Sequence, residues 1–162
     1  MHPPQLPMPR YMARESAPAA FSGSEQVIPP LSKAAASLIS IVEDDRFFGE
    51  SMRRLMRSLG YKVEVFPSAM AFINSPRFAR TAVLIADIYM PGMTGLELYR
   101  HLIHTGHPIP TILMTSHPDE DVESAALQDG VVGYLRKPLD EQHLVRCLRA
   151  ALARGESRRE SP

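Results

Sequence analysis

The sequence predicts an α/β domain built on a doubly wound, five-stranded parallel sheet with five helices. Short apolar stretches of strand length alternate five times with segments of helical periodicity. The strand stretches are apolar almost throughout rather than at every second residue, which is typical of parallel strands covered by helices on both faces. In addition, acidic, hydroxyl or basic residues follow several of these strands, where an open α/β sheet binds its ligand.

The first half of the domain contains two strand and helix pairs. An apolar strand is predicted at 38–42, directly before three acidic residues. The helix after it has apolar residues at the spacing i, i+4, i+7 and i+11, namely Phe48, Met52, Leu55 and Leu59. Gly60 stands where that helix should end. A second strand is predicted at 62–66, and Ser68 can cap a short helix that carries Met70, Phe72 and Ile73.

The second half repeats the alternation three times. The predicted elements are, in order, a strand at 82–86 ending at Asp87, a helix at 95–104, a strand at 111–114 ending at Thr115, a helix at 119–129 closed by Gly130, a strand at 131–135 and a helix at 140–154.

Both ends of the chain differ in composition from this central region. Residues 1–36 hold 7 of the 15 prolines among mostly small and polar residues, so we expect a disordered extension that buries too little to repay its ordering. We expect the folded domain to span 37–154 and a flexible tail to span 155–162. We therefore expect no second domain.

Composition narrows the functional classes. Lys and Arg total 18, as do Asp and Glu, so the balanced charge gives no bulk reason to bind nucleic acid or a membrane surface directly. The single cysteine, Cys147, excludes an internal disulfide and suits the reducing cytoplasm. We find no pattern of an export signal and no apolar stretch long enough to span a membrane.

The residues expected at the carboxyl ends of the strands suggest a chemistry. Three or four carboxylates with one lysine form a site short of positive charge, and such oxygen ligands favour Mg²⁺. The cation would offset carboxylate repulsion and orient a phosphoryl group. Asp87 would then be the nucleophile that forms an aspartyl phosphate. Lys137 would neutralise one phosphoryl oxygen, and the Thr115 hydroxyl would bind another.

At this point the sequence resembles a known family, the receiver domains of response regulators in two-component signalling. The stretch Asp87-Ile88-Tyr89-Met90-Pro91-Gly92-Met93-Thr94-Gly95 is similar to the family's phosphorylation motif. Val42-Glu43-Asp44-Asp45 resembles its acid pocket, and Thr115, Tyr134 and Lys137-Pro138 resemble its switch and phosphate-binding positions. The resemblance runs from about Leu38 to Ala153 and implies the flavodoxin-like fold.

The resemblance also implies individual roles. Asp87 would be the phosphoacceptor, Asp44 would bind Mg²⁺ directly and Glu43 through water, and Asp45 can share that task. Tyr89 would offer its main-chain carbonyl to the metal. Thr115 and Tyr134 would form the switch, and Tyr134 would rotate from an exposed to a buried position on phosphorylation. The bond before Pro138 would be cis, which would aim Lys137 into the site.

Partners follow from the same resemblance. The phosphoryl donor would be a histidine kinase or a histidine phosphotransfer protein. An unknown downstream protein would bind the face formed by the fourth helix, the fifth strand and the fifth helix. A second copy of the chain is another partner, in a homodimer that forms on phosphorylation. The pattern is most similar to receivers that head two-domain transcription regulators, although we expect a single-domain form here.

Two other functions share parts of this pattern. A phosphohydrolase with an aspartyl nucleophile would carry a second aspartate two residues later as general acid, where this chain has Tyr89. An unphosphorylated pseudo-receiver scaffold would usually lack the acceptor, the acids or the lysine, and this chain keeps them all. His101, His104 and His107 match no standard zinc spacing, and Cys147 is interpreted as a packing residue.

Overall fold

The computed structural model describes residues 36–161. The strands are β1 (Leu38–Val42), β2 (Lys62–Phe66), β3 (Thr81–Asp87), β4 (Thr111–Thr115) and β5 (Gly133–Arg136). The α-helices are α1 (Arg46–Ser58), α2 (Ala69–Ile73), α3 (Gly95–His104), α4 (Glu120–Asp129) and α5 (Glu141–Glu160). All ten predicted elements are present. The structure adds a short 3-10 helix, η2 (Phe78–Arg80), directly before β3.

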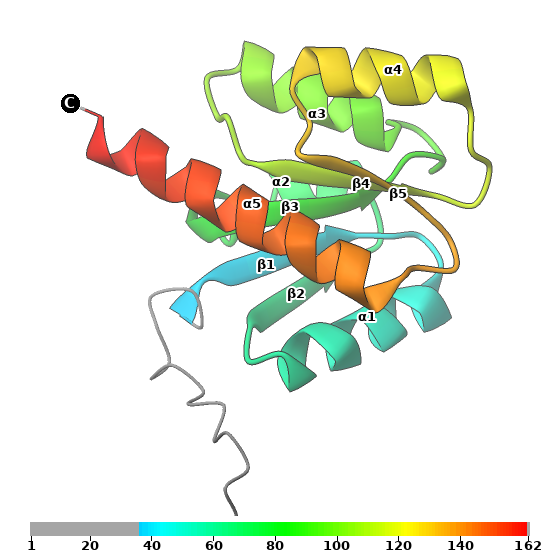
Figure 1. Cartoon of the computed structure of the whole chain (residues 1–162), viewed down its shortest axis with the longest axis horizontal. Helices are drawn as coiled ribbons and strands as arrows, with labels where there is room; N and C mark the ends of the chain where they lie inside the picture. Colours follow the sequence, from blue (N-terminus) through cyan, green and yellow to red (C-terminus); the bar gives the residue numbers. More distant parts are fainter. Residues whose placement is uncertain (1–35, 162) are drawn as a thin grey trace, which may run out of the picture. The chain divides into compact units, whose positions relative to one another are not determined.

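The five strands form one parallel sheet with the order β2-β1-β3-β4-β5. The chain moves outward from β1 to β2, then crosses back to β3 and continues in the other direction (Figure 1). The strand order therefore reverses between β1 and β3, and the loops after these two strands lie at the place where such sheets bind ligands. The predicted doubly wound parallel sheet is confirmed.

Helices cover both faces of the sheet. One apolar cluster joins the sheet to α1 and α5, and the other joins it to α2, α3 and α4 (Figure 1). Strand β3 shows the reason for its continuous apolar sequence, because Ile85 faces the first cluster while Leu84 and Ala86 face the second, all fully buried. Cys147 is buried in the first cluster, in agreement with its predicted packing role.

Each α-helix begins at a residue whose side chain accepts a hydrogen bond from the helix's first turn. These N-cap residues are Asp45, Ser68, Thr94, Asp119 and Asp140. Such caps satisfy backbone N–H groups that have no partner inside the helix. At the other end of α4, Gly130 adopts a left-handed conformation that favours glycine. The caps fix where each loop at the carboxyl edge of the sheet ends.

The last helix is longer than predicted. We expected it to end at Arg154 and a flexible tail to follow, but α5 continues to Glu160, so the tail prediction is wrong for 155–160. A glycine inside a helix costs only about 1 kcal/mol relative to alanine, so Gly155 did not end the helix. Two guanidinium groups also tie the helix to the domain: Arg154 donates to the Gly130 carbonyl at 3.1 Å and Arg158 to that of Pro108 at 2.7 Å.

The predicted extension at 1–36 lies outside the described residues except for Ala36. Among the helices in residues 36–161, none combines the length and the apolar character needed to cross a bilayer.

Candidate functional site

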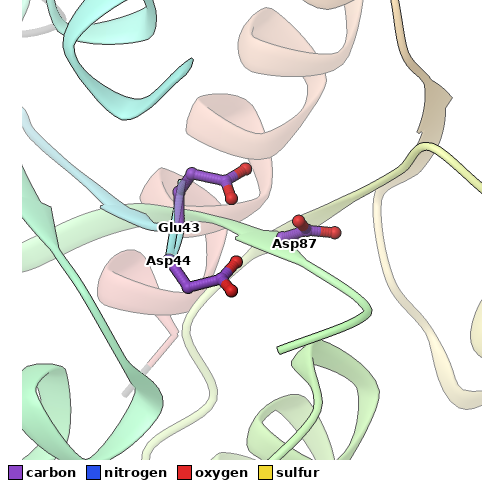
Figure 2. A group of neighbouring side chains, drawn as sticks. All are labelled: Glu43, Asp44 and Asp87. Atoms are coloured by element: carbon purple, nitrogen blue, oxygen red, sulfur yellow. The ribbon is translucent and has the colours of Figure 1, made fainter. Parts of the chain in front are cut away.

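Three acidic side chains meet at the carboxyl edge of the sheet. Glu43 and Asp44 follow β1, and Asp87 is the last residue of β3. One carboxylate oxygen from each lies within 4.8 Å of the others, and Figure 2 shows the three carboxyl groups beside the two strand ends. Glu43 and Asp87 are buried, whereas Asp44 is exposed. The parallel pairing of β1 with β3 therefore brings together the acids that the sequence placed at these two strand ends.

Lys137 reaches the three acids from β5, the strand at one edge of the sheet. It directly follows β5, and its backbone N–H donates to the Thr115 carbonyl at 2.8 Å, which holds the loop against the end of β4. Its ammonium donates to Glu43 Oε2 at 2.6 Å and to Asp87 Oδ2 at 3.1 Å. The Lys137–Pro138 peptide bond is cis, as the resemblance implied. One partly buried cation thus bridges two buried carboxylates.

Burial and charge oppose each other at this ion pair. Burial raises the pKa of Glu43 to about 7, although the hydrogen bonds from Lys137 and from the Asp45 backbone lower it. Burial also acts to lower the pKa of Lys137, but its hydrogen bonds to Glu43 and Asp87 outweigh this and raise the pKa overall. Lys137 therefore stays charged at neutral pH. With three acids and one cation, the site is short of positive charge.

The three consecutive acids after β1 have different surroundings. Asp44 makes no hydrogen bond or ion pair within residues 36–161, so its oxygens are available to a cation. Asp45 lies outside the acid group, because its Oδ1 accepts the backbone N–H groups of Phe47 at 2.9 Å and Phe48 at 3.1 Å. Asp45 is the N-cap of α1. The acid group of Glu43, Asp44 and Asp87 offers only hard oxygen ligands, which fits Mg²⁺.

The loop after β3 also contacts the Asp87 carboxylate. The Tyr89 backbone N–H donates to Asp87 Oδ1 at 3.3 Å, and the half-exposed Tyr89 ring meets the His117 ring edge-on at 5.9 Å. Further along the loop, a Cβ atom on Gly95 would lie 2.3 Å from the Asp87 carbonyl oxygen. Only glycine lets α3 begin this close to the end of β3. The predicted role of the Tyr89 carbonyl as a metal ligand stays a prediction.

The two predicted switch residues lie on neighbouring strands. Thr115 ends β4, is fully buried, and accepts the His117 backbone N–H at 3.0 Å on its hydroxyl oxygen. Tyr134 on β5 is only 6% exposed, and its hydroxyl accepts the Asp119 backbone N–H at 3.4 Å. We expected Tyr134 to move from an exposed to a buried position on phosphorylation. In this structure the ring is already buried, and its hydroxyl contacts the N-cap of α4.

One aromatic residue at the site was assigned only a packing role by the sequence. The Phe48 ring, on the first turn of α1, lies with its centroid 4.0 Å from Lys137 Nζ. Its helical spacing predicted the core, and it does pack against the apolar cluster beside α1 and α5. The signal for a second role was its place in the chain, because the first turn of a helix that follows a strand lies beside that strand's carboxyl end.

Comparison with known proteins identifies the class to which this fold and site belong. The family model of the response regulator receiver domain matches residues 39–149. The chain therefore belongs to the receiver domain family, as the sequence resemblance indicated. Receiver domains generally bind Mg²⁺ at an acidic pocket, and Glu43, Asp44 and Asp87 form an acidic cluster in this structure.

Individual relatives agree with this assignment. The response regulator protein TodT of Pseudomonas putida is 38% identical over 117 residues, which cover 72% of this chain and 52% of TodT. The transcriptional regulatory protein FixJ of Bradyrhizobium diazoefficiens is 29% identical, with 73% of this chain and 58% of FixJ covered. The chain thus spans little more than half the length of these curated relatives.

Solved structures support the same fold. The response regulator StyR has a TM-score of 0.71 at 32% identity, over 77% of this chain and 63% of StyR. A receiver domain protein from Clostridium thermocellum has a TM-score of 0.69 at 24% identity, over 75% of this chain and 98% of that one, which shows the fold alone.

Proposed function

We propose that this chain is a response regulator that accepts a phosphoryl group on Asp87 from a histidine kinase or a histidine phosphotransfer protein. One observation carries the proposal: Lys137, 50 residues further along the chain, binds Asp87 at the carboxyl edge of the sheet beside two further acids. We further propose that it acts in the cytoplasm, in agreement with the sequence expectations above.

The proposed reaction is a transfer between two side chains. An Asp87 carboxylate oxygen forms a bond to phosphorus as the bond from phosphorus to the donor's imidazole nitrogen breaks, and the imidazole keeps that electron pair. The Lys137 ammonium, already within hydrogen-bonding distance of Asp87, neutralises a phosphoryl oxygen. The Thr115 hydroxyl, which accepts a hydrogen bond from the His117 N–H, can use its own proton to bind another phosphoryl oxygen.

Asp44, Asp87, the Tyr89 carbonyl and, through water, Glu43 would hold Mg²⁺ at this site. The bound cation would offset the charge that carboxylates and phosphoryl oxygens accumulate together. The exposure of Asp44 and its lack of protein partners in the described part of the chain support this assignment. Both carboxylate oxygens of Glu43 already accept hydrogen bonds, Oε1 from the Asp45 backbone N–H and Oε2 from the Lys137 ammonium, so Glu43 would bind the cation through water.

The proposed output is a change at the surface formed by α4, β5 and α5. Phosphorylation brings nearly two negative charges to Asp87, next to Thr115 at the end of β4. A shift of Thr115 toward the phosphoryl group would be transmitted to Tyr134 and from there to Asp119, which begins α4. A downstream protein, or a second copy of the chain, can read this change only if it binds the two surface states with different affinity.

Labelling with a small phosphodonor tests the proposal. The wild-type chain should take up one phosphoryl group in the presence of Mg²⁺, and Asp87→Asn should take up none. Asp121→Asn, which changes an exposed acid in the first turn of α4, should label like wild type. Equal labelling of Asp87→Asn and wild type would refute the acceptor assignment. A wild-type chain that never labels would favour the scaffold, and repeated turnover of phosphate monoesters would favour the phosphohydrolase.

A further inference from the structure

The Lys137 ammonium is enclosed by three groups. Glu43 Oε2 and Asp87 Oδ2 accept hydrogen bonds from it at 2.6 and 3.1 Å, and the Phe48 ring lies 4.0 Å away. Only 12% of the lysine side chain is exposed. A cation above the face of an aromatic ring is attracted by the ring's negative face, and the attraction grows where water is excluded. The aromatic contact is therefore part of the lysine's environment rather than an incidental neighbour.

We propose that Phe48 is a positioning residue for phosphoryl transfer, whose ring face holds the Lys137 ammonium where it can meet the phosphoryl group. This inference rests on the proposed function of Asp87. Glu43 competes for the same ammonium through a short charge-assisted hydrogen bond. The ring attracts the cation without accepting a conventional hydrogen bond, so an N–H group remains for a phosphoryl oxygen. Phe48 thereby keeps Lys137 beside Asp87 and shields it from water.

Local structure fixes the ring in this place. Phe48 is the third residue of α1, and its backbone N–H donates to the N-cap Asp45 at 3.1 Å. The next residue, Gly49, packs so closely that an added Cβ atom would lie 3.0 Å from Val65 Cγ1 and 3.8 Å from Glu43. The helix therefore begins tightly against the acid. Asp45, as the N-cap, fixes where α1 begins and so where the Phe48 ring lies. The Phe47 side chain, by contrast, is 85% exposed.

The neighbouring phenylalanine supplies a matched control. Phe48→Leu removes the aromatic face and keeps an apolar side chain, and it should slow labelling of Asp87 by phosphoramidate in Mg²⁺ about three- to tenfold. Phe47→Leu makes the same change one residue earlier, on an exposed side chain, and should leave the rate unchanged. Phe48→Tyr, which keeps the ring, should restore most of the rate lost in Phe48→Leu.

Fluorinated phenylalanines at position 48 separate the electrostatic effect from packing, because fluorine weakens the ring's negative face with little change in shape. The labelling rate should fall stepwise as fluorine atoms are added. In an NMR spectrum without phosphodonor, the ring-current shift of the Lys137 methylene protons next to Nζ should persist through this series and vanish in Phe48→Leu.

Three results would overturn the inference: a fluorinated series with a constant labelling rate, a Phe48→Leu variant as fast as wild type, or an absent ring-current shift. Failure of the proposed function is distinguishable from these, because the wild-type chain would then take up no label at all.

Discussion

Replacing Gly95 by alanine should lower the stability of the domain and displace the backbone of Asp87, the proposed acceptor. The new Cβ atom would lie 2.3 Å from the Asp87 carbonyl oxygen, 2.9 Å from the Asp87 carbonyl carbon and 3.2 Å from Ile88 Cα. All three are backbone atoms, so no flexible side chain can move aside. Relief requires the start of α3 and the end of β3 to separate by about 1 Å, since ordinary contacts lie near 3.5 Å.

The size of the effect follows from these contacts. Overpacking typically costs about 1–3 kcal/mol, and a clash between backbone segments belongs at the upper end. The separation would also weaken the hydrogen bond from Gly95 N–H to the Ile88 carbonyl, now 3.0 Å long, a loss of about 1 kcal/mol. The higher helix propensity of alanine offsets about 0.5–1 kcal/mol of this loss of stability. We expect the free energy of unfolding to fall by about 3 kcal/mol.

Urea unfolding followed by circular dichroism measures this change. With a slope of about 2 kcal/mol per molar urea, the midpoint should fall by about 1.5 M. Gly155→Ala is the matched control in α5, because its Cβ atom would meet Pro110 Cγ at 3.7 Å and the Ala82 carbonyl oxygen at 3.8 Å, which are ordinary contacts. It should raise the free energy of unfolding by about 0.5–1 kcal/mol. An unchanged midpoint for Gly95→Ala would refute the close approach, and no gain from Gly155→Ala would contradict a helix that continues to Glu160.

Four further perturbations test other parts of the molecule. Asp44→Ala should weaken Mg²⁺ binding in a fluorescence or NMR titration with little loss of stability. Asp45→Ala should lower the free energy of unfolding by about 1 kcal/mol and should weaken Mg²⁺ binding less. The reverse pattern would mean that Asp45 binds the cation and Asp44 does not. Thr115→Ala should still label but should not show the wild-type NMR shifts around Tyr134 with the phosphoryl mimic beryllofluoride, and full shifts would mean that another residue couples the site to the surface. Deleting residues 1–36 should leave the melting temperature and the labelling rate almost unchanged because the segment's composition offers little to bury; a large drop in melting temperature would show that it packs on the domain.

Sequence periodicity was sufficient for the main architecture. The apolar run at β3 and the spacing along α1 placed those elements within a few residues of their observed bounds. The acids at the carboxyl ends of β1 and β3 were expected to meet Lys137, because parallel strands bring their carboxyl ends to one edge. The hydrogen bonds from Lys137 to Glu43 and Asp87 have this cause.

Features set by tertiary contacts were less accessible to sequence reasoning. The end of α5 depends on hydrogen bonds from Arg154 and Arg158 to loops distant in sequence. No residue pattern near the end of the helix predicts these contacts. The contact of Phe48 with Lys137 joins residues 89 positions apart, and helical spacing alone identified the ring as core. The sequence allowed Asp45 to share in metal binding, and only the structure shows that its side chain makes two N-cap hydrogen bonds at the start of α1.

The distance along the chain between the acids and their cation affects how the domain is made. Lys137 follows Glu43 by 94 residues and Asp87 by 50, and it reaches them only after β5 has joined the sheet beside β4. During synthesis from the N-terminus, the acids emerge first and repel one another without a neutralising partner. Closing such long loops costs conformational entropy, and the contacts that offset this cost form only when β5 joins the sheet. A chain interrupted before β5 would therefore carry Asp87 without Lys137, so the proposed phosphorylation would require a completed domain.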